Sequence, residues 1–255
     1  MSLNLARCGI GNATLHALAQ KQTLRSLHLG QTLIDDGALP DLATLLPLTD
    51  LELSYSGLRT TTLAPLAPLT ALESLALAGL PLDDAGLQPL ATFTQLRDLD
   101  VSATKLDGDG LRPLATIRQL RTLDASKTLL DSAAIDGLLA LPLTTLRLDS
   151  TRIDDGAAPR LAQLRALTQL AVSGTRLHDA ALAQLTSLPL TQLELRATLI
   201  TDGAQPVLTR LSLARLDLRN THLSRAALAR LRKRFGKGLI AGGKPQTPDD
   251  PMWLP

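Results

Sequence analysis

Aromatic side chains are nearly absent from this sequence. Only 2% of its 255 residues are aromatic, and Tyr55, Phe93, Phe235 and Trp253 are the whole set. Hydrophobic residues nevertheless make up 45% of the chain, with leucine and alanine the commonest among them. That apolar content excludes a disordered chain. It favours a core in which one leucine layer is repeated, because such a core has no irregular gaps that need aromatic rings.

Cysteine and long apolar runs are also scarce. Cys8 is the only cysteine, so no internal disulfide can form, and the disulfide-capped extracellular repeat proteins are not expected. No run approaches the roughly eighteen apolar residues of a membrane span. The segment Met1–Arg7 has no basic stretch followed by an apolar core and predicts no signal peptide, although the chain begins inside a repeat. We expect a cytoplasmic rather than an extracellular location, and secretion into a host cell stays open.

Positive charge is concentrated near the C-terminal end, although the formal net charge is only +2. Residues 1–224 carry 19 basic and 22 acidic side chains. The only charged residues at 225–237 are cations, namely Arg225, Arg230, Arg232, Lys233, Arg234 and Lys237. We expect a capping helix here, with Leu228, Leu231 and Phe235 over the end of the core and the cations in water. Nucleic acid or acidic lipid is the alternative partner, but apart from Phe235 the run lacks the aromatic residues that stack on bases.

One pattern, Leu-x-x-Leu-x-Leu-x-x-Thr-x-Leu/Ile, recurs along nearly the whole chain. Its first leucine lies at nine positions spaced by 23 or 24 residues: Leu24, Leu48, Leu72, Leu96, Leu120, Leu143, Leu167, Leu190 and Leu213. An incomplete tenth copy opens the chain at Leu3. A fixed period of this length is typical of a solenoid, in which stacked repeats share one continuous core.

The spacing within each repeat predicts its local structure. Alternating leucines, from Leu3–Leu5 and Leu27–Leu29 to Leu216–Leu218, predict ten short strands with one buried face. Equivalent strands one repeat apart run in the same direction and form a parallel sheet. Later in each repeat, apolar residues recur at a spacing of three, as in Leu111 and Leu114, which predicts a short helix or 3-10 turn on the convex side. The fold class is therefore an α/β horseshoe of about ten repeats with a concave parallel sheet.

Two polar positions recur with the leucines and invite a functional interpretation. The asparagine position of many such repeats is mostly threonine: Thr32, Thr104, Thr128, Thr151, Thr175, Thr198 and Thr221. We interpret these hydroxyls as partners for backbone groups where the chain leaves the sheet. Aspartates follow the same turn at Asp35–Asp36, Asp83–Asp84, Asp154–Asp155, Asp179 and Asp202. We interpret them as helix N-caps rather than as a metal site.

These motifs resemble a known group of proteins. The unit is similar to that of bacterial leucine-rich-repeat proteins related to the repeats of F-box substrate receptors. Ile34–Leu39 (Ile-Asp-Asp-Gly-Ala-Leu) and Ile200–Ala204 (Ile-Thr-Asp-Gly-Ala) look like the signature of GALA-type effectors from plant-pathogenic bacteria. The stretch Ala227–Phe235 looks like the basic closing helix of such arrays. The resemblance covers about residues 2–240 and implies the leucine-rich-repeat fold, but the sequence contains no F-box segment and no ligase domain.

The domain organisation follows from the repeats. Residues 1–240 are expected to form one leucine-rich-repeat domain, in which residues 225–240 are the C-terminal capping helix and closing segment. Residues 241–255 are rich in glycine and proline and are expected to be a flexible linker or an extended strap.

Candidate binding residues come from the outward-facing strand positions. The residue between the two leucines forms a column of Asn4, His28, Glu52, Ala76, Asp100, Asp124, Arg147, Ala171, Glu194 and Asp217. With their neighbours, the charged members give ten candidates for partner binding on the concave face: Asp98, Asp100, Asp124, Arg147, Asp149, Glu194, Arg196, Arg215, Asp217 and Arg219. Like charges on neighbouring strands cost up to about 1 kcal/mol. They indicate either a surface that meets a complementary partner or a sheet face kept polar against aggregation.

Catalytic arrangements are missing from the sequence. The four histidines lie in separate repeats, and Cys8 occupies the threonine position, where its small size fits. His28 beside Glu52 supplies only two metal ligands, and there is no glycine-rich phosphate loop or paired-cysteine motif. We therefore expect no catalytic, cofactor-binding or metal-binding residues, and no cofactor.

The sequence thus predicts a protein–protein interaction module that binds a macromolecular partner through its concave face. It would serve as the recognition part of a bacterial effector or scaffold, act as a monomer, and bind protein rather than nucleic acid. Two alternatives stay open. One is the recognition domain of a larger enzyme, such as a ubiquitin-ligase-type effector whose catalytic part lies outside this chain. The other is a structural repeat protein with no fixed ligand.

Overall fold

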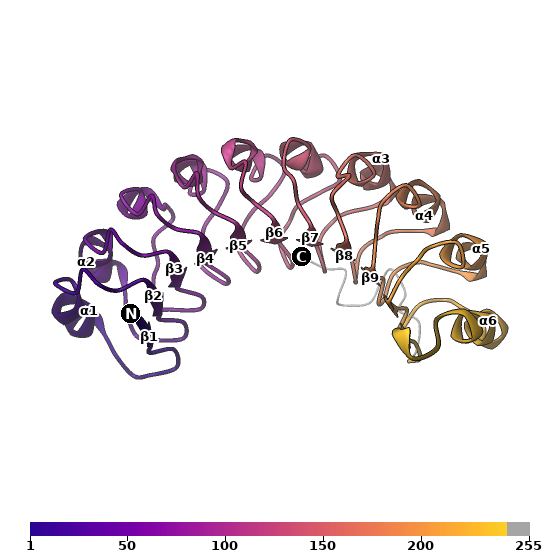
Figure 1. Ribbon diagram of the computed structural model, residues 1–255, viewed down its shortest axis with the longest axis horizontal. Helices are drawn as coiled ribbons and strands as arrows, with labels where there is room; N and C mark the ends of the chain where they lie inside the picture. The colour runs from indigo at the N-terminus through magenta and orange to yellow at the C-terminus, as the bar shows by residue number, and fades with distance from the viewer. Residues whose placement is uncertain (244–255) are drawn as a thin grey trace.

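The computed structural model describes residues 1–243, which form one curved array (Figure 1). Strands line the inner edge of the arc, and helices and 3-10 turns line its outer edge (Figure 1). The chain is therefore a leucine-rich-repeat horseshoe, as the repeat pattern predicts. Of the tail expected at residues 241–255, the part from residue 244 on lies outside the described residues.

Within the described residues, eleven parallel strands form one sheet in chain order. They are β1 (Ser2–Asn4), β2 (Ser26–His28), β3 (Asp50–Glu52), β4 (Ser74–Ala76), β5 (Asp98–Asp100), β6 (Thr122–Asp124), β7 (Thr145–Arg147), β8 (Gln169–Ala171), β9 (Gln192–Glu194), β10 (Arg215–Asp217) and β11 (Leu239–Ile240). The first ten strands are the predicted ones, each ending just before the second apolar residue of its segment, which is leucine except at Val101, Ala125 and Val172. The eleventh was not predicted, because Leu239 and Ile240 carry no repeat motif and only their pairing with Leu216 and Asp217 makes them a strand.

The convex side combines short α-helices with 3-10 turns. The α-helices are α1 (Asn12–Leu18), α2 (Leu39–Ala43), α3 (Ala158–Leu161), α4 (Asp179–Leu185), α5 (Gln205–Leu208) and α6 (Arg225–Phe235). The 3-10 turns are η1 (Asp36–Ala38), η2 (Ala64–Leu66), η3 (Gln88–Thr92), η4 (Arg112–Thr116), η5 (Ala134–Leu138), η6 (Asp155–Ala157), η7 (Asp202–Ala204) and η8 (Gly236–Gly238). Proline occupies the first turn of several, where its missing N–H costs nothing, and this keeps the elements short.

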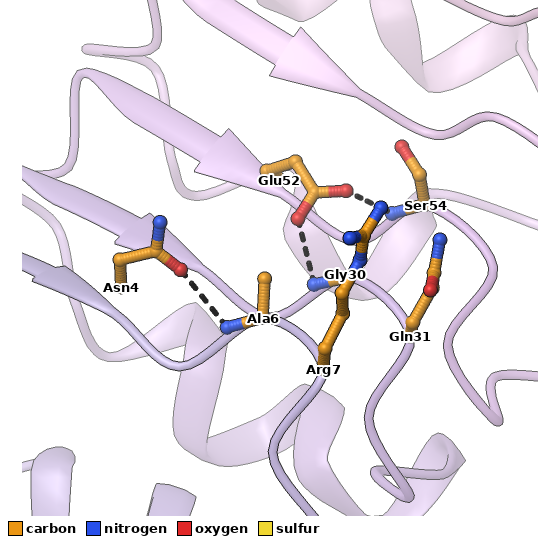
Figure 2. A pocket seen from close by; sticks show the side chains of 7 residues that line it. All are labelled: Asn4, Ala6, Arg7, Gly30, Gln31, Glu52 and Ser54. Carbon is orange, nitrogen blue, oxygen red and sulfur yellow. Dashed lines mark hydrogen bonds between the residues drawn. The ribbon is translucent and has the colours of Figure 1, made fainter.

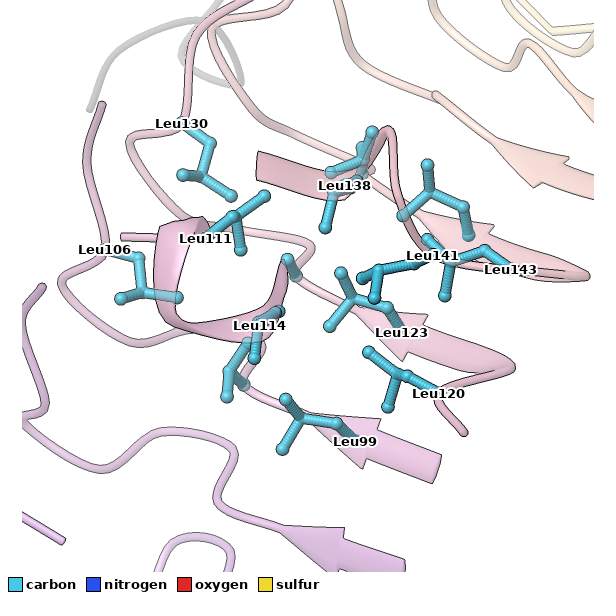
Figure 3. Packing of buried hydrophobic residues seen from close by; sticks show 14 of the residues in the cluster. Leu99, Leu106, Leu111, Leu114, Leu120, Leu123, Leu130, Leu138, Leu141 and Leu143 are labelled. Carbon is cyan, nitrogen blue, oxygen red and sulfur yellow. The ribbon is translucent and has the colours of Figure 1, made fainter. Parts of the chain in front are cut away.

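The core is a leucine layer between the sheet and the convex elements. Figure 3 shows Leu99 and Leu123 reaching from the strands toward Leu111 and Leu114 of the convex segment. Leu146 has no exposed surface, and Leu123 and Leu170 pair with it on the neighbouring strands. Phe93 is the one large aromatic ring fully buried among the described residues. Stacked identical layers therefore supply the core, as the low aromatic content suggests.

The threonine column has the structural role that its position predicts. Each of the seven threonine hydroxyls donates to the carbonyl of the residue three positions earlier, at 2.6–2.7 Å, as in Thr151 Oγ1 to Leu148 O. At Leu80, which has no hydroxyl, the main-chain N–H donates to Leu77 O instead, at 3.2 Å. Ser56 in the same column leaves a buried Oγ with no hydrogen-bond partner. The column therefore satisfies the turn carbonyls and is not a row of reactive hydroxyls.

The aspartates divide into two roles, which corrects the assignment of all of them as N-caps. Asp35 and Asp154 cap their own 3-10 turns, accepting from the N–H groups of Gly37 and Gly156 at 2.9 Å each. The following acids reach instead to the backbone of the next repeat. This second column is made up of Asp36, which accepts from Arg59 and Thr60, Asp84 from Asp107, Asp155 from His178, Asp179 from Thr201, and Asp202 from Ser224. These acids join neighbouring repeats along the edge of the horseshoe.

The helix α6 closes the C-terminal end of the leucine layer. Ser224 caps the helix by accepting from the Ala227 N–H at 3.2 Å. Leu231 of this helix is fully buried, whereas the cations of α6 are exposed. Arg234 lies over the Phe235 ring, with the guanidinium carbon 5.3 Å from the ring centroid.

A first prediction concerns the leucine layer. Leu146→Ala should lower the free energy of unfolding by about 2–5 kcal/mol, because it leaves a cavity in the middle of the array. Thr145→Ala, a change on the half-exposed outer side of the same strand, is the control. Chemical denaturation measures both. Equal midpoints for the two variants would contradict the register described here.

A second prediction concerns the threonine column. Thr151→Val keeps the shape of the side chain but removes the hydroxyl that donates to the buried Leu148 carbonyl. It should destabilise the chain by about 1–3 kcal/mol, the typical cost of an unsatisfied buried polar group. Thr151→Ser, which keeps the hydroxyl, should recover most of that loss in the same denaturation experiment. A Val variant as stable as the wild type would show that the column is dispensable.

A third prediction concerns acid stability. Hydrogen bonds from Ser132 and from the Gly156 N–H hold the pKa of Asp154 below its ordinary value. A carboxylate with a lowered folded-state pKa contributes stability above its unfolded pKa of about 3.9 and loses it as the pH falls through the folded value. Asp154→Asn keeps an acceptor oxygen but cannot be protonated, so urea midpoints measured from pH 6 down to pH 2 should fall less steeply than in the wild type. Asp98→Asn, which changes an exposed carboxylate, is the control, and identical slopes for the Asp154 variant and the wild type would contradict the role of Asp154.

Candidate partner-binding surface

The concave face is built from the outward positions of ten strands. The predicted column is in register, with Asp100 directly beside Asp124, and Ala171 between Arg147 and Glu194. Side chains of this column lie about 4.8 Å apart from strand to strand. The sheet therefore converts a sequence period into a continuous row of charged and small side chains.

Acidic residues dominate the N-terminal half of this face. Strand β4 presents only small outward side chains, and two acids flank it on each side: Asp50 and Glu52 on β3, and Asp98 and Asp100 on β5. We call these four residues the acidic row. Glu52 accepts from the N–H groups of Gly30 and Ser54 at 2.6 and 2.9 Å, so the backbone fixes this carboxylate.

Arg147 separates the acidic row from the C-terminal half of the face. Its Nε lies 3.3 Å from Asp124 Oδ2, and its Nη2 lies 3.1 Å from Asp149 Oδ2. Asp149 Oδ1 also accepts from the Ser173 N–H at 2.7 Å. The expected repulsion between Asp100 and Asp124 is thus relieved, because an arginine on the next strand neutralises Asp124.

A hollow opens beyond Arg147, over the repeat that contains β8. Small residues line its floor. Ser173 and Gly174 follow β8, and Ser150 lies beside them on the preceding repeat. Gly174 has a φ of 64°, and a Cβ there would lie 3.1 Å from Ser150 Oγ, so this position favours glycine. Six of the ten predicted residues line the hollow with Lys127, namely Arg147, Asp149, Glu194, Arg196, Asp217 and Arg219. We call this site the charged hollow.

One wall of the charged hollow is a tight ion pair. Arg219 donates to both carboxylate oxygens of Asp217, and its backbone N–H donates to Asp217 Oδ1 at 3.0 Å. The carboxylate, together with the nearby Glu194, raises the pKa of the Arg219 guanidinium above its usual value. Asp217 is only 1% exposed, so the expectation that it points to solvent is wrong. The long arginine covers it, and only Arg219 is available to a partner.

The remaining cations of the hollow have no partner of opposite charge. Among the described residues, neither Arg196 nor Lys127 has a carboxylate oxygen within 4.0 Å, and both side chains are exposed. Glu194 also lacks such an ion pair and lies on the side toward β8, beside Ala171. The hollow thus offers two free cations, one free carboxylate and two arginines already bound to aspartates.

The structure does not gather all ten predicted residues. Asp98, Asp100 and Asp124 lie on the other side of Arg147, toward the N-terminal end. Arg215 is exposed at the first position of β10, outside the lining of the charged hollow.

A second concave pocket was missed by the sequence analysis. It lies at the N-terminal end and is lined by Asn4, Ala6, Arg7, Gly30, Gln31, Glu52 and Ser54 (Figure 2). Figure 2 shows Glu52 turned toward the backbone N–H groups of Gly30 and Ser54, from which its two oxygens accept hydrogen bonds. The column of outward residues between the leucines includes Asn4 and Glu52. Nothing in the sequence shows that their side-chain oxygens accept hydrogen bonds from backbone N–H groups of the turns.

The structure also places the histidine and the cysteine that the sequence analysis considered. His28 stands beside Glu52 in the strand register, as predicted, but its Nε2 lies 2.8 Å from Asp50 Oδ2. No group of three or more His, Cys, Asp or Glu side chains within residues 1–243 is placed to hold a metal ion. Cys8 is exposed. No helix in the same range is long and apolar enough to cross a membrane.

Comparison with known proteins places the fold. No protein-family model matches the sequence, and no curated protein matches it. The solved structure of an internalin (inlF) from Listeria monocytogenes is similar over 96% of this chain and 87% of the internalin, with 18% sequence identity and a TM-score of 0.57. The leucine-rich-repeat ectodomain of the Arabidopsis receptor kinase HAESA, at 20% identity and a TM-score of 0.60, is matched over 87% of this chain. The match covers only 38% of that ectodomain, so the chain corresponds to a part of it. At these identities the likeness establishes the leucine-rich-repeat fold.

Proposed function

We propose that this chain is a protein-interaction module that binds its partner on the concave face. The observation that carries the proposal is the clustering of six predicted charged residues around the charged hollow, with two of its cations unpaired. A sheet face that only needed to stay in water would gain nothing from cations left unpaired around one hollow. Charged residues of this kind steer association and select partners of complementary charge.

The architecture supports the same proposal. The HAESA ectodomain was solved in complex with an N-terminal extended IDA peptide hormone ligand, so a horseshoe of this kind holds a peptide in at least that protein. Within residues 1–243, Tyr55 is the one exposed aromatic residue near the concave face, and it is 52% exposed. Interfaces usually draw most of their binding energy from Trp, Tyr and Arg. Arg147 on β7, Arg196 after β9 and Arg219 after β10 therefore take the place of aromatic anchors in our proposal.

The biological setting is a finer part of the proposal. We infer that the chain is the recognition part of a bacterial effector or scaffold, because the Gly-Ala signatures at Ile34–Leu39 and Ile200–Ala204 resemble those of GALA-type effectors. Absence of translocation, when the chain is fused to a reporter in a bacterium with a host-directed secretion system, would contradict the effector assignment. A monomer in analytical ultracentrifugation is expected.

A fourth prediction tests which face binds. Random 16-residue peptides displayed in a library and selected on the intact chain provide the probe. Asp98→Lys combined with Asp100→Lys should weaken the selected peptides about tenfold or more and mainly slow their association, because electrostatics act on encounter. Surface-based binding kinetics give both rates.

The matched control reverses two charges on the convex side, Arg112→Glu with Arg118→Glu. Arg112 pairs with Asp109 of its own turn at 3.0 Å, so this pair of substitutions changes charge without touching the sheet. The control should bind as the wild type does. Loss of binding in the convex variant, with binding retained in the concave one, would overturn the proposal.

A further inference from the structure

Two strands of the concave face carry alanine at the outward position between their core residues, where the other eight of the first ten strands carry longer side chains. On β4 the outward residues are Ser74 and Ala76, and the Tyr55 ring lies against Gly79 beyond them. The repeat of β8 begins with the exposed Gln169 and then presents Ala171, followed by Ser173 and Gly174. We call Ser74 and Ala76 the β4 lane, and the small residues from Ala171 to Gly174 the β8 lane.

The flanks of the two lanes differ in charge. The β4 lane is flanked by the acidic row, and no lysine or arginine occupies the outward positions of β3 to β5. His28, on β2, contacts one member of this row, Asp50, through its Nε2. The β8 lane opens into the charged hollow, where Arg196 and Lys127 are the free cations. The lanes are four strands apart, or about 19 Å at the spacing of a sheet.

The charges within the hollow show where a ligand fits. Asp149 is bound by Arg147 and by the Ser173 N–H, and Asp217 is covered by Arg219, so neither of these acids repels an incoming anion at full strength. Glu194 is the one acid left without a partner, and it faces the strand side of the lane. An anionic group over Ser173 would therefore lie between Arg196 and Lys127, away from Glu194.

We propose that the concave face binds an extended protein segment that carries two residues of opposite charge. The basic residue of the segment binds in the β4 lane, and its acidic residue binds in the charged hollow. An extended chain advances about 3.3 Å per residue, so the two charged residues lie about six positions apart in the sequence of the partner. Arg147, bound to Asp124 and Asp149, stands between the two lanes and keeps their charges apart. This inference rests on the proposed function and adds the chemistry and spacing of the partner.

The test uses the same displayed 16-residue peptides, selected on the intact chain and then synthesised. Selected peptides should carry a Lys or Arg and an Asp or Glu about six positions apart. Arg196→Glu should weaken their binding about tenfold, and replacing the acidic residue of the peptide with lysine should restore binding to that variant. The restored pair shows direct contact, because loss of folding in the variant could not be rescued by a change in the peptide.

A matched control tests the position of the effect. Arg165→Glu makes the same substitution at an exposed residue between α3 and β8 that does not line the hollow. It should leave the affinity unchanged. Circular dichroism and thermal melting confirm that both variants fold, as expected for exposed arginines.

The outcomes separate the two proposals. One outcome would overturn the two-charge inference but not the proposed binding on the concave face. In that outcome the selected peptides depend on Asp98 and Asp100 but lack the acidic residue, or their affinity is unchanged by Arg196→Glu. Peptides that depend on Arg112 and Arg118 instead would overturn both proposals. A selection that yields no binder also overturns both, since a face that binds extended segments must retain some of them.

Discussion

Each repeat must bury one leucine layer without leaving the polar backbone of its turn unpaired, and the rest of the structure depends on this constraint. A leucine layer alone is not specific, because many compact arrangements bury leucine. The threonine column decides the arrangement, since each hydroxyl reaches a carbonyl that the parallel ladder cannot satisfy. The second aspartate column then joins each turn to the next repeat. The leucines thus set the core, the threonine sets the turn, and the second aspartate sets the stacking of each 23- or 24-residue unit on the next.

The same constraint leaves the concave face free to vary. Outward strand residues do not fill the leucine layer, so the core does not dictate which residue stands at each of these positions. The sheet still fixes their positions, because register places residues of successive repeats about 4.8 Å apart. Small residues at β4 and β8, acids around the first and arginines around the second are therefore differences on a regular scaffold. We attribute partner selection to those differences.

Much of the fold could be predicted because it repeats. The spacing of Leu24 to Leu213, with the incomplete copy at Leu3, predicted the ten strands and their parallel order. The threonine positions predicted the hydrogen bonds between hydroxyls and backbone groups of the turns. The strand β11 could not be predicted, since Leu239 and Ile240 form it only by pairing with β10. The candidate surface was predictable as a set of outward residues but not as a geometry. Burial of Asp217 under Arg219, and the neutralisation of Asp124 by Arg147, depend on side-chain conformations that periodicity does not encode.

The central claim is that a partner lies along the concave face, and photo-crosslinking from two nearby positions tests it most directly. Gln169 is exposed at the start of β8 on the concave side, whereas Gln163 is exposed after α3 on the convex side. A photoreactive benzoylphenylalanine at each position replaces the same residue type in the same stretch of chain, so the main difference is the face. The account predicts that a selected peptide crosslinks from position 169 and not from position 163. Crosslinking from position 163 alone would contradict it.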